Sequence, residues 1–141
     1  MKSYFAKYLI IFIISSIFSN SLIGQENSIK DCYKFLNSGF VSDGQEYKAI
    51  LDENNKSAFY TTFYGGSQYR IIACSDIENY PLILSVFDTE KNLLFCNKNY
   101  DYTPFWNFTF TSTIDCIIEI EFKAETLLKD EVILLIGFKE K

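Results

Sequence analysis

The sequence predicts an all-β fold, an antiparallel β-sandwich or jelly roll of about eight strands with one short N-terminal helix. Aromatic residues are abundant, with 14 Phe and 10 Tyr among 141 residues, and aromatic and β-branched side chains favour strands. From residue 46 onward, apolar and polar residues alternate over short runs that turn residues separate. No later stretch resembles the helical crossovers that join parallel strands. These observations indicate one antiparallel domain.

The first 24 residues have the pattern of a secretory signal peptide. Lys2 and Lys7 form a positively charged start, and an apolar run from Tyr8 to Phe18 follows. This run is shorter than the roughly 20 residues that a membrane-spanning helix needs. Because no second long apolar run follows, we expect no membrane span after signal cleavage.

Small residues mark the expected cleavage site. Cleavage after Gly24 places Gln25 at the new N-terminus, and cleavage after Ser21 fits the same rule. An uncleaved N-terminal anchor is the alternative, whereas a lipoprotein is not expected because no cysteine lies in this region. The sequence therefore predicts a signal peptide at 1–24, a single domain at 25–141, and a periplasmic or secreted location.

The predicted mature chain is acidic. Residues 1–24 contain two lysines and no acidic residue, so 11 basic and 18 acidic residues remain and the net charge is −7. Such a surface repels phosphates, and a nucleic-acid partner is therefore not expected. The remaining 117 residues are enough for one hydrophobic core.

A short helix is predicted from residue 27 to about residue 37. Asn27 or Ser28 can cap its start, and Gly39 follows its end. The apolar residues that recur at helical spacing are Ile29, Cys32, Tyr33 and Leu36. We expect this helix to cover one edge or one end of a sheet.

Eight strands are predicted after this helix. In chain order they are 46–52, 57–64, 69–75, 82–88, 93–96, 105–111, 115–122 and 131–138. Gly65-Gly66-Ser67 predicts a tight hairpin between the second and third strands, and Thr89–Asn92 predicts one between the fourth and fifth. The last strand is apolar almost throughout, which indicates a central position in a sheet.

The cysteines are compatible with disulfides. All four lie in the predicted mature chain: Cys32, Cys74, Cys96 and Cys116. In an oxidising compartment they permit two disulfides with three connectivities, and buried free thiols are the alternative. No CxxC pair is present, which argues against a redox motif or a zinc ribbon.

The chain contains no histidine, which excludes histidine-dependent nucleophilic catalysis, histidine acid–base catalysis and histidine-ligated zinc. Gly65-Gly66 precedes a predicted strand rather than a helix, so it is not a phosphate-binding loop. Glu119 and Glu121 are the remaining candidates for a hydrolase, since alternate residues of a strand lie about 6.5–7 Å apart. The opposite face of their strand is apolar, which instead places both glutamates on a solvated face.

No cofactor and no metal site is predicted. Oxygen-rich clusters can bind calcium, and the chain has several acidic or amide residues in predicted loops. These residues are Asp52, Glu53, Asn54, Asn55, Asp88, Asp101 and Asp115. They lack EF-hand spacing, and Asp and Asn are common in ordinary turns. Turn formation is therefore the preferred interpretation.

The loop before the sixth strand supplies the candidate ligand-binding residues Tyr100, Tyr102 and Phe105. Aromatic rings stack on the apolar faces of sugars, and the polar ends of tyrosines find hydrogen-bond partners. The neighbouring Trp106 alternates with Phe108 and Phe110, so we expect it in the core.

Four segments resemble short exported bacterial proteins of unassigned function. They are YGGSQYRIIACSD (Tyr64–Asp76), LSVFDTEKNLLFCN (Leu84–Asn97), FWNFTFTST (Phe105–Thr113) and LLIGFK (Leu134–Lys139). Between Glu46 and Lys139, the order of strands and turns is also similar to pre-peptidase C-terminal β-sandwich domains. Those domains are accessory modules of secreted enzymes and supply no catalytic residue. The resemblance implies a sandwich. The chain departs from those domains in that we expect the module to stand alone, without an attached enzyme.

The sequence thus predicts an exported, non-enzymatic β-sandwich that binds a glycan or an envelope protein. The main alternative is a small secreted hydrolase that uses Glu119 and Glu121. A third hypothesis is an assembly component that pairs through an exposed edge strand.

Overall fold

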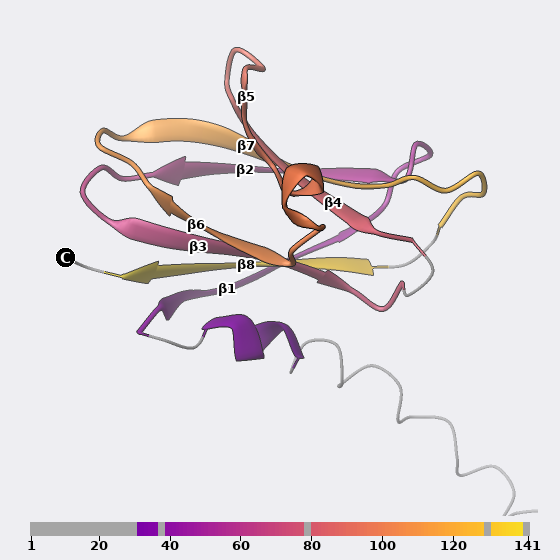
Figure 1. Ribbon diagram of the computed structural model, residues 1–141, viewed down its shortest axis with the longest axis horizontal. Coiled ribbons are helices and arrows are strands. Elements are labelled where there is room, and N and C mark those ends of the chain that lie inside the picture. The colour runs from indigo at the N-terminus through magenta and orange to yellow at the C-terminus, as the bar shows by residue number, and fades with distance from the viewer. Residues whose placement is uncertain (1–30, 37–38, 78–79, 129–130, 140–141) are drawn as a thin grey trace, which may run out of the picture.

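The computed structural model describes residues 31–36, 39–77, 80–128 and 131–139. These residues form two stacked sheets of four strands each, which confirms the predicted antiparallel β-sandwich (Figure 1). Sheet 1 contains, in spatial order, β1 (Val41–Ile50), β8 (Glu131–Lys139), β3 (Gln68–Ser75) and β6 (Phe105–Thr109). Sheet 2 contains β2 (Lys56–Phe63), β7 (Ile114–Phe122), β4 (Leu82–Asp88) and β5 (Leu93–Cys96). The predicted signal peptide and its cleavage site lie outside the described residues.

The strand order is that of a jelly roll. Every pairing is antiparallel, and the chain changes sheet at every connection except β4–β5. The hairpin predicted at Thr89–Asn92 is therefore confirmed. All eight predicted strands are present, and the largest difference is that β1 begins earlier, at Val41.

The hairpin predicted at Gly65-Gly66-Ser67 is wrong. β2 pairs with β7, and β3 pairs with β8 and β6, so this turn carries the chain between the sheets. It packs against the β6–β7 connection. The Gly66 N–H donates to the Phe110 carbonyl oxygen at 2.9 Å, and a Cβ on Gly65 would lie 2.8 Å from the Ser112 Cα. The missing side chain of Gly65 thus allows two connections to approach closely.

Alternate side chains from both sheets fill the interior. The buried, inward-facing residues of β7 are Cys116, Ile118, Ile120 and Phe122. Trp106 of β6 packs against the same core, as predicted, and its ring lies 4.9 Å from that of Phe95 on β5. The core therefore runs without a break from β1 and β2 to β5 and β6.

β8 is buried on both faces, which explains its almost continuous apolar sequence. It lies between β1 and β3, and its predicted central position is confirmed. Leu134 and Ile136 face sheet 2, whereas Ile133 and Leu135 face away from it and are still buried. This outer apolar face needs a cover of its own.

Helical residues 31–36 provide that cover, and the segment ends in the 3₁₀ helix η1 (Lys34–Leu36). Cys32 and Leu36 pack on the outer face of β3 and β8, on the side of sheet 1 that faces away from sheet 2 (Figure 1). The predicted position at an edge or end is therefore wrong, because the sheet presents an apolar outer face. The first residues of the predicted helix lie outside the described part of the chain.

Arg70 of β3 links this cover to β6. Its guanidinium carbon lies 4.3 Å from the ring centroid of Phe40 and 4.7 Å from that of Phe105. Its Nε donates to Asn107 Oδ1, and its Nη1 donates to the Phe35 carbonyl oxygen, both at 2.7 Å. Burial lowers the pKa of Arg70, while these contacts stabilise its charged form.

One of the two permitted disulfides forms, between Cys32 and Cys74. It fastens the helical segment to β3. The second is not formed: Cys96 and Cys116 are free. Cys96 pairs with Ser85, which pairs with Glu119 on the outer face of sheet 2. Because Cys116 is three residues from Glu119 in the same strand, its side chain faces the interior and cannot reach Cys96.

Replacing Cys32 and Cys74 together with serine should lower the free energy of unfolding by about 2–4 kcal/mol. The disulfide spans a sequence separation of 42 and constrains the unfolded chain. Urea denaturation of the oxidised protein measures the change. Cys96→Ser is the matched control and should cost less than about 1 kcal/mol. An equal loss in both variants would contradict this role of the disulfide.

Candidate functional site

A bulge in β1 opens one side of the sandwich. Ser42 pairs with Gly137 and Glu46 pairs with Leu135, so four steps along β1 correspond to two along β8. Gly44 lies within the bulge at a φ of 82°, a conformation that glycine adopts readily. Ile136, between the two paired residues of β8, consequently has no partner in β1. Such bulges redirect side chains and interrupt pairing.

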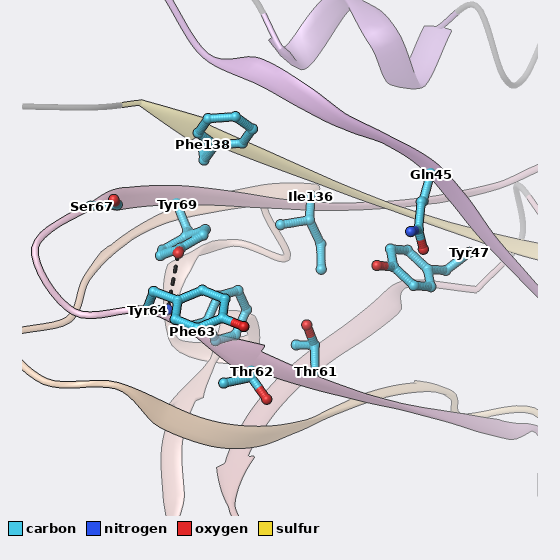
Figure 2. A pocket seen from close by; sticks show the side chains of 10 residues that line it. All are labelled: Gln45, Tyr47, Thr61, Thr62, Phe63, Tyr64, Ser67, Tyr69, Ile136 and Phe138. Carbon is cyan, nitrogen blue, oxygen red and sulfur yellow. Dashed lines mark hydrogen bonds between the residues drawn. The ribbon is translucent and has the colours of Figure 1, made fainter.

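A pocket of about 580 Å³ lies between the two sheets beside this bulge (Figure 2). Its aromatic lining residues are Tyr47, Phe63, Tyr64, Tyr69 and Phe138. Its other lining residues are Gln45, Thr61, Thr62, Ser67 and Ile136. None of these ten residues is an acid or a base of the Asp, Glu, Lys, Arg or His type. We call this space the inter-sheet pocket.

The back wall of the inter-sheet pocket is held by aromatic packing. The ring of Phe63 lies 4.8 Å from that of Tyr69 and 4.9 Å from that of Phe110. The Tyr64 N–H donates to the Tyr69 hydroxyl oxygen at 3.0 Å, which joins β3 to the end of β2. The side chain of Tyr64 itself is 65% exposed. A fixed wall and an exposed ring at the rim are typical of a preformed ligand site.

Three polar side chains line this pocket from opposite sheets. Figure 2 shows Gln45 and the hydroxyl of Tyr47 on the β1 side, with Thr61 of β2 facing them. Thr61 lies between the inward-facing Phe59 and Phe63 of β2, at a position that the alternation assigns to the interior. A hydroxyl at an interior strand position is a sequence signal that points to this site.

The three predicted ligand-binding residues do not form a common surface. Tyr100 ends the 3₁₀ helix η2 (Asn97–Tyr100), and its ring packs 4.3 Å from Trp106. Tyr102 follows in a turn, and these two tyrosines are 47% and 40% exposed. Phe105 lies on the opposite face of β6 from Trp106, 5.4 Å from Phe35, where it helps to hold the N-terminal cover.

Asn97 positions the loop that carries Tyr100 and Tyr102. Its side chain is fully buried. Its Oδ1 accepts from the Leu84 N–H at 3.0 Å, and its Nδ2 donates to the carbonyl oxygens of Leu82 and Thr103 at 3.0 and 3.1 Å. The sequence placed Asn97 in a polar loop and gave no sign of this structural role.

The candidate carboxylates Glu119 and Glu121 lie on the outer face of sheet 2, within an ion-pair network. Lys56 Nζ lies 3.3 Å from an oxygen of each, and Lys123 Nζ lies 2.9 Å from Glu121 Oε1. Burial raises the pKa of Glu121, but the hydrogen bonds and charges of Lys123 and Lys56 outweigh it, and the net shift is downward. A general acid needs a raised pKa instead.

A second pocket of about 440 Å³ lies beside the disulfide. Its lining includes Cys74, Asp31 and Asp76. Both carboxylates are exposed, so neither is an enclosed polar group of the kind that orients a bound ligand. Neither pocket is lined by Glu119 or Glu121.

The carboxylates of two predicted loops accept hydrogen bonds within their own turns. Asp52 Oδ1 accepts from the N–H groups of Asn54 and Lys56 at 2.8 and 2.9 Å. Asp88 Oδ1 accepts from those of Glu90 and Asn92 at 2.9 and 2.8 Å. The backbone bonds lower the pKa of Asp52. The pKa of Asp88 is lowered chiefly by the hydrogen bond that Asn92 Nδ2 donates to its Oδ2 at 2.8 Å, and further by the backbone bonds. Within the described ranges, no group of three or more His, Cys, Asp or Glu residues is arranged to hold a metal ion.

Neither a protein-family model nor a curated protein sequence matches this chain. The similarity to pre-peptidase C-terminal domains therefore stays a prediction. Among the described residues, no helix has the length and apolar character needed to cross a membrane.

Glu121→Gln should destabilise the protein at pH 7 by less than about 1 kcal/mol, because the ion pairs that it removes are partly exposed. The lowered pKa of Glu121 contributes stability above the ordinary value of 4.5, and this contribution is lost as the pH falls through the folded-state pKa. The difference between wild type and variant should therefore shrink below pH 4.5.

Urea denaturation at several pH values measures this difference. Glu53→Gln, at an exposed turn position, is the control. If the Glu121→Gln variant were instead more stable than wild type at pH 7, Glu121 would be a strained, functional carboxylate.

Proposed function

We propose that the chain is an exported, non-enzymatic binding module for an envelope or extracellular partner, and that the inter-sheet pocket receives part of that partner. The observation that supports this proposal is the lining of the pocket, in which aromatic rings stand beside neutral hydroxyl and amide groups. Apolar walls with a few converging polar groups are typical of binding sites for neutral organic groups.

The chemistry of the site supports binding rather than catalysis. General acid–base catalysis needs a titratable side chain near the reacting atoms. Apart from tyrosine hydroxyls, the pocket lining offers no such group: it has no carboxylate, lysine, arginine or cysteine, and the chain has no histidine. The remaining carboxylate pair, Glu119 and Glu121, forms ion pairs with Lys56 and Lys123 outside both pockets.

The disulfide supports the exported location. Stable disulfides form in oxidising compartments such as the periplasm or the extracellular space. The Cys32–Cys74 bond links the N-terminal segment to the centre of sheet 1. Together with the signal peptide predicted at 1–24, it favours a periplasmic or secreted module.

Tyr64→Ala should weaken binding to the partner about tenfold, which is about 1.4 kcal/mol. Tyr64 is 65% exposed at the rim of the pocket, so its loss should leave the core intact. Sedimentation of the mature domain with isolated envelope polysaccharide, and separately with envelope proteins, measures retention.

Tyr60→Ala is the matched control, because Tyr60 is 74% exposed and lies outside the pocket lining, at a position of β2 that alternates with the inward-facing Phe59. The Tyr60→Ala variant should be retained on envelope material to the same extent as the wild-type protein. Equal retention of both variants would contradict the proposed site. Release of reducing sugar ends that Glu119→Gln abolishes would favour the hydrolase alternative.

A further inference from the structure

We infer that the inter-sheet pocket binds one or two neutral pyranose rings of a glycan. This inference rests on the proposed function and adds the chemical class of the ligand. It also moves the expected sugar site away from Tyr100, Tyr102 and Phe105, which do not share a surface, to residues of β1, β2, β3 and β8.

The aromatic lining matches the apolar faces of a sugar ring. A pyranose presents C–H groups on its faces, and these pack against aromatic rings, as apolar groups do generally. Tyr64 offers an exposed ring at the rim, while Tyr47, Tyr69 and Phe138 line the walls. The volume of about 580 Å³ lies within the usual range for small-ligand sites, roughly 300–1,000 Å³.

The polar lining matches the hydroxyl groups of a sugar. Sugar hydroxyls both donate and accept, and so does the hydroxyl of Thr61 on β2. The Tyr69 hydroxyl oxygen accepts from the Tyr64 N–H and keeps its own proton to donate. The pocket therefore presents neutral, two-way hydrogen-bonding groups from both sheets.

The same lining disfavours other ligand classes. A charged ligand would lose its hydration without meeting an opposite charge in the lining. A hydrocarbon chain would take the Thr61 hydroxyl away from water and offer no replacement partner, at a cost of about 1–3 kcal/mol. A neutral polyhydroxyl ligand meets neither penalty.

The test titrates the mature domain separately with cellobiose, maltose, lactose and N,N′-diacetylchitobiose, and follows amide chemical shifts. At least one disaccharide should bind saturably. Thr61→Val keeps the shape of the side chain but removes its hydroxyl, and it should weaken that binding about tenfold. Thr109→Val is the matched control, since Thr109 is exposed on β6 outside the pocket, and it should bind as wild type.

Tyr64→Ala serves as a second variant should Thr61→Val perturb the fold, and it should also weaken sugar binding. 1-Octanol is the apolar comparison ligand. Binding of 1-octanol but of none of the four sugars, with Thr61→Val binding 1-octanol more tightly, would overturn the sugar inference and leave the proposed binding pocket standing. If Tyr64→Ala changed neither the binding of sugar, nor the binding of 1-octanol, nor retention on envelope material, both the sugar inference and the proposed binding pocket would be overturned.

Discussion

The structure depends on the burial of β8 on both of its faces. Its inward side chains, such as Leu134 and Ile136, complete the core between the sheets, and its outward Ile133 and Leu135 form a second apolar surface. Fully burying one such side chain contributes about 1.5–3 kcal/mol, so an exposed outer face would be costly. The helical segment 31–36 lies on this face, and the Cys32–Cys74 disulfide fastens it there. Sheet 2 has a different outer face, with Lys56 paired to Glu119 and Glu121, and charged groups of this kind interact well with water.

The inter-sheet pocket follows from the position of β1 at the edge of sheet 1. Among the described strands, β1 pairs only with β8, so it can leave its partner at the bulge around Gly44 while β8 stays fixed between β1 and β3. At the bulge, part of the β1–β8 pairing is lost, and the sandwich is open on the side next to β2. Rings such as Phe63 and Tyr69 keep the rear of this opening rigid. A stable centre therefore supports an irregular edge, which is where proteins commonly place binding groups.

The strands could be predicted from the sequence because period-two alternation is a local property. The partner of each strand could not be predicted. The alternation of apolar and polar residues around Gly65-Gly66 is the same whether the chain turns back within one sheet or crosses to the other. Disulfide pairing had the same limit: only the register shows that Cys96 faces outward and Cys116 inward. The pocket was missed because its residues are far apart in the sequence, from Gln45 to Phe138. Tyr100 and Tyr102 stood out because they are close together in the chain, yet one packs on Trp106 and both depend on Asn97 for their placement.

The most direct test of the binding account is a map of amide chemical-shift changes on saturation with the tightest-binding of the four disaccharides. If the sugar binds in the inter-sheet pocket, the largest changes should lie in the β1 bulge around Gly44 and Gln45, at the end of β2 from Thr61 to Tyr64, and in β8 from Ile136 to Phe138. Changes centred instead on residues 100–105, or on the outer face of sheet 2, would contradict it.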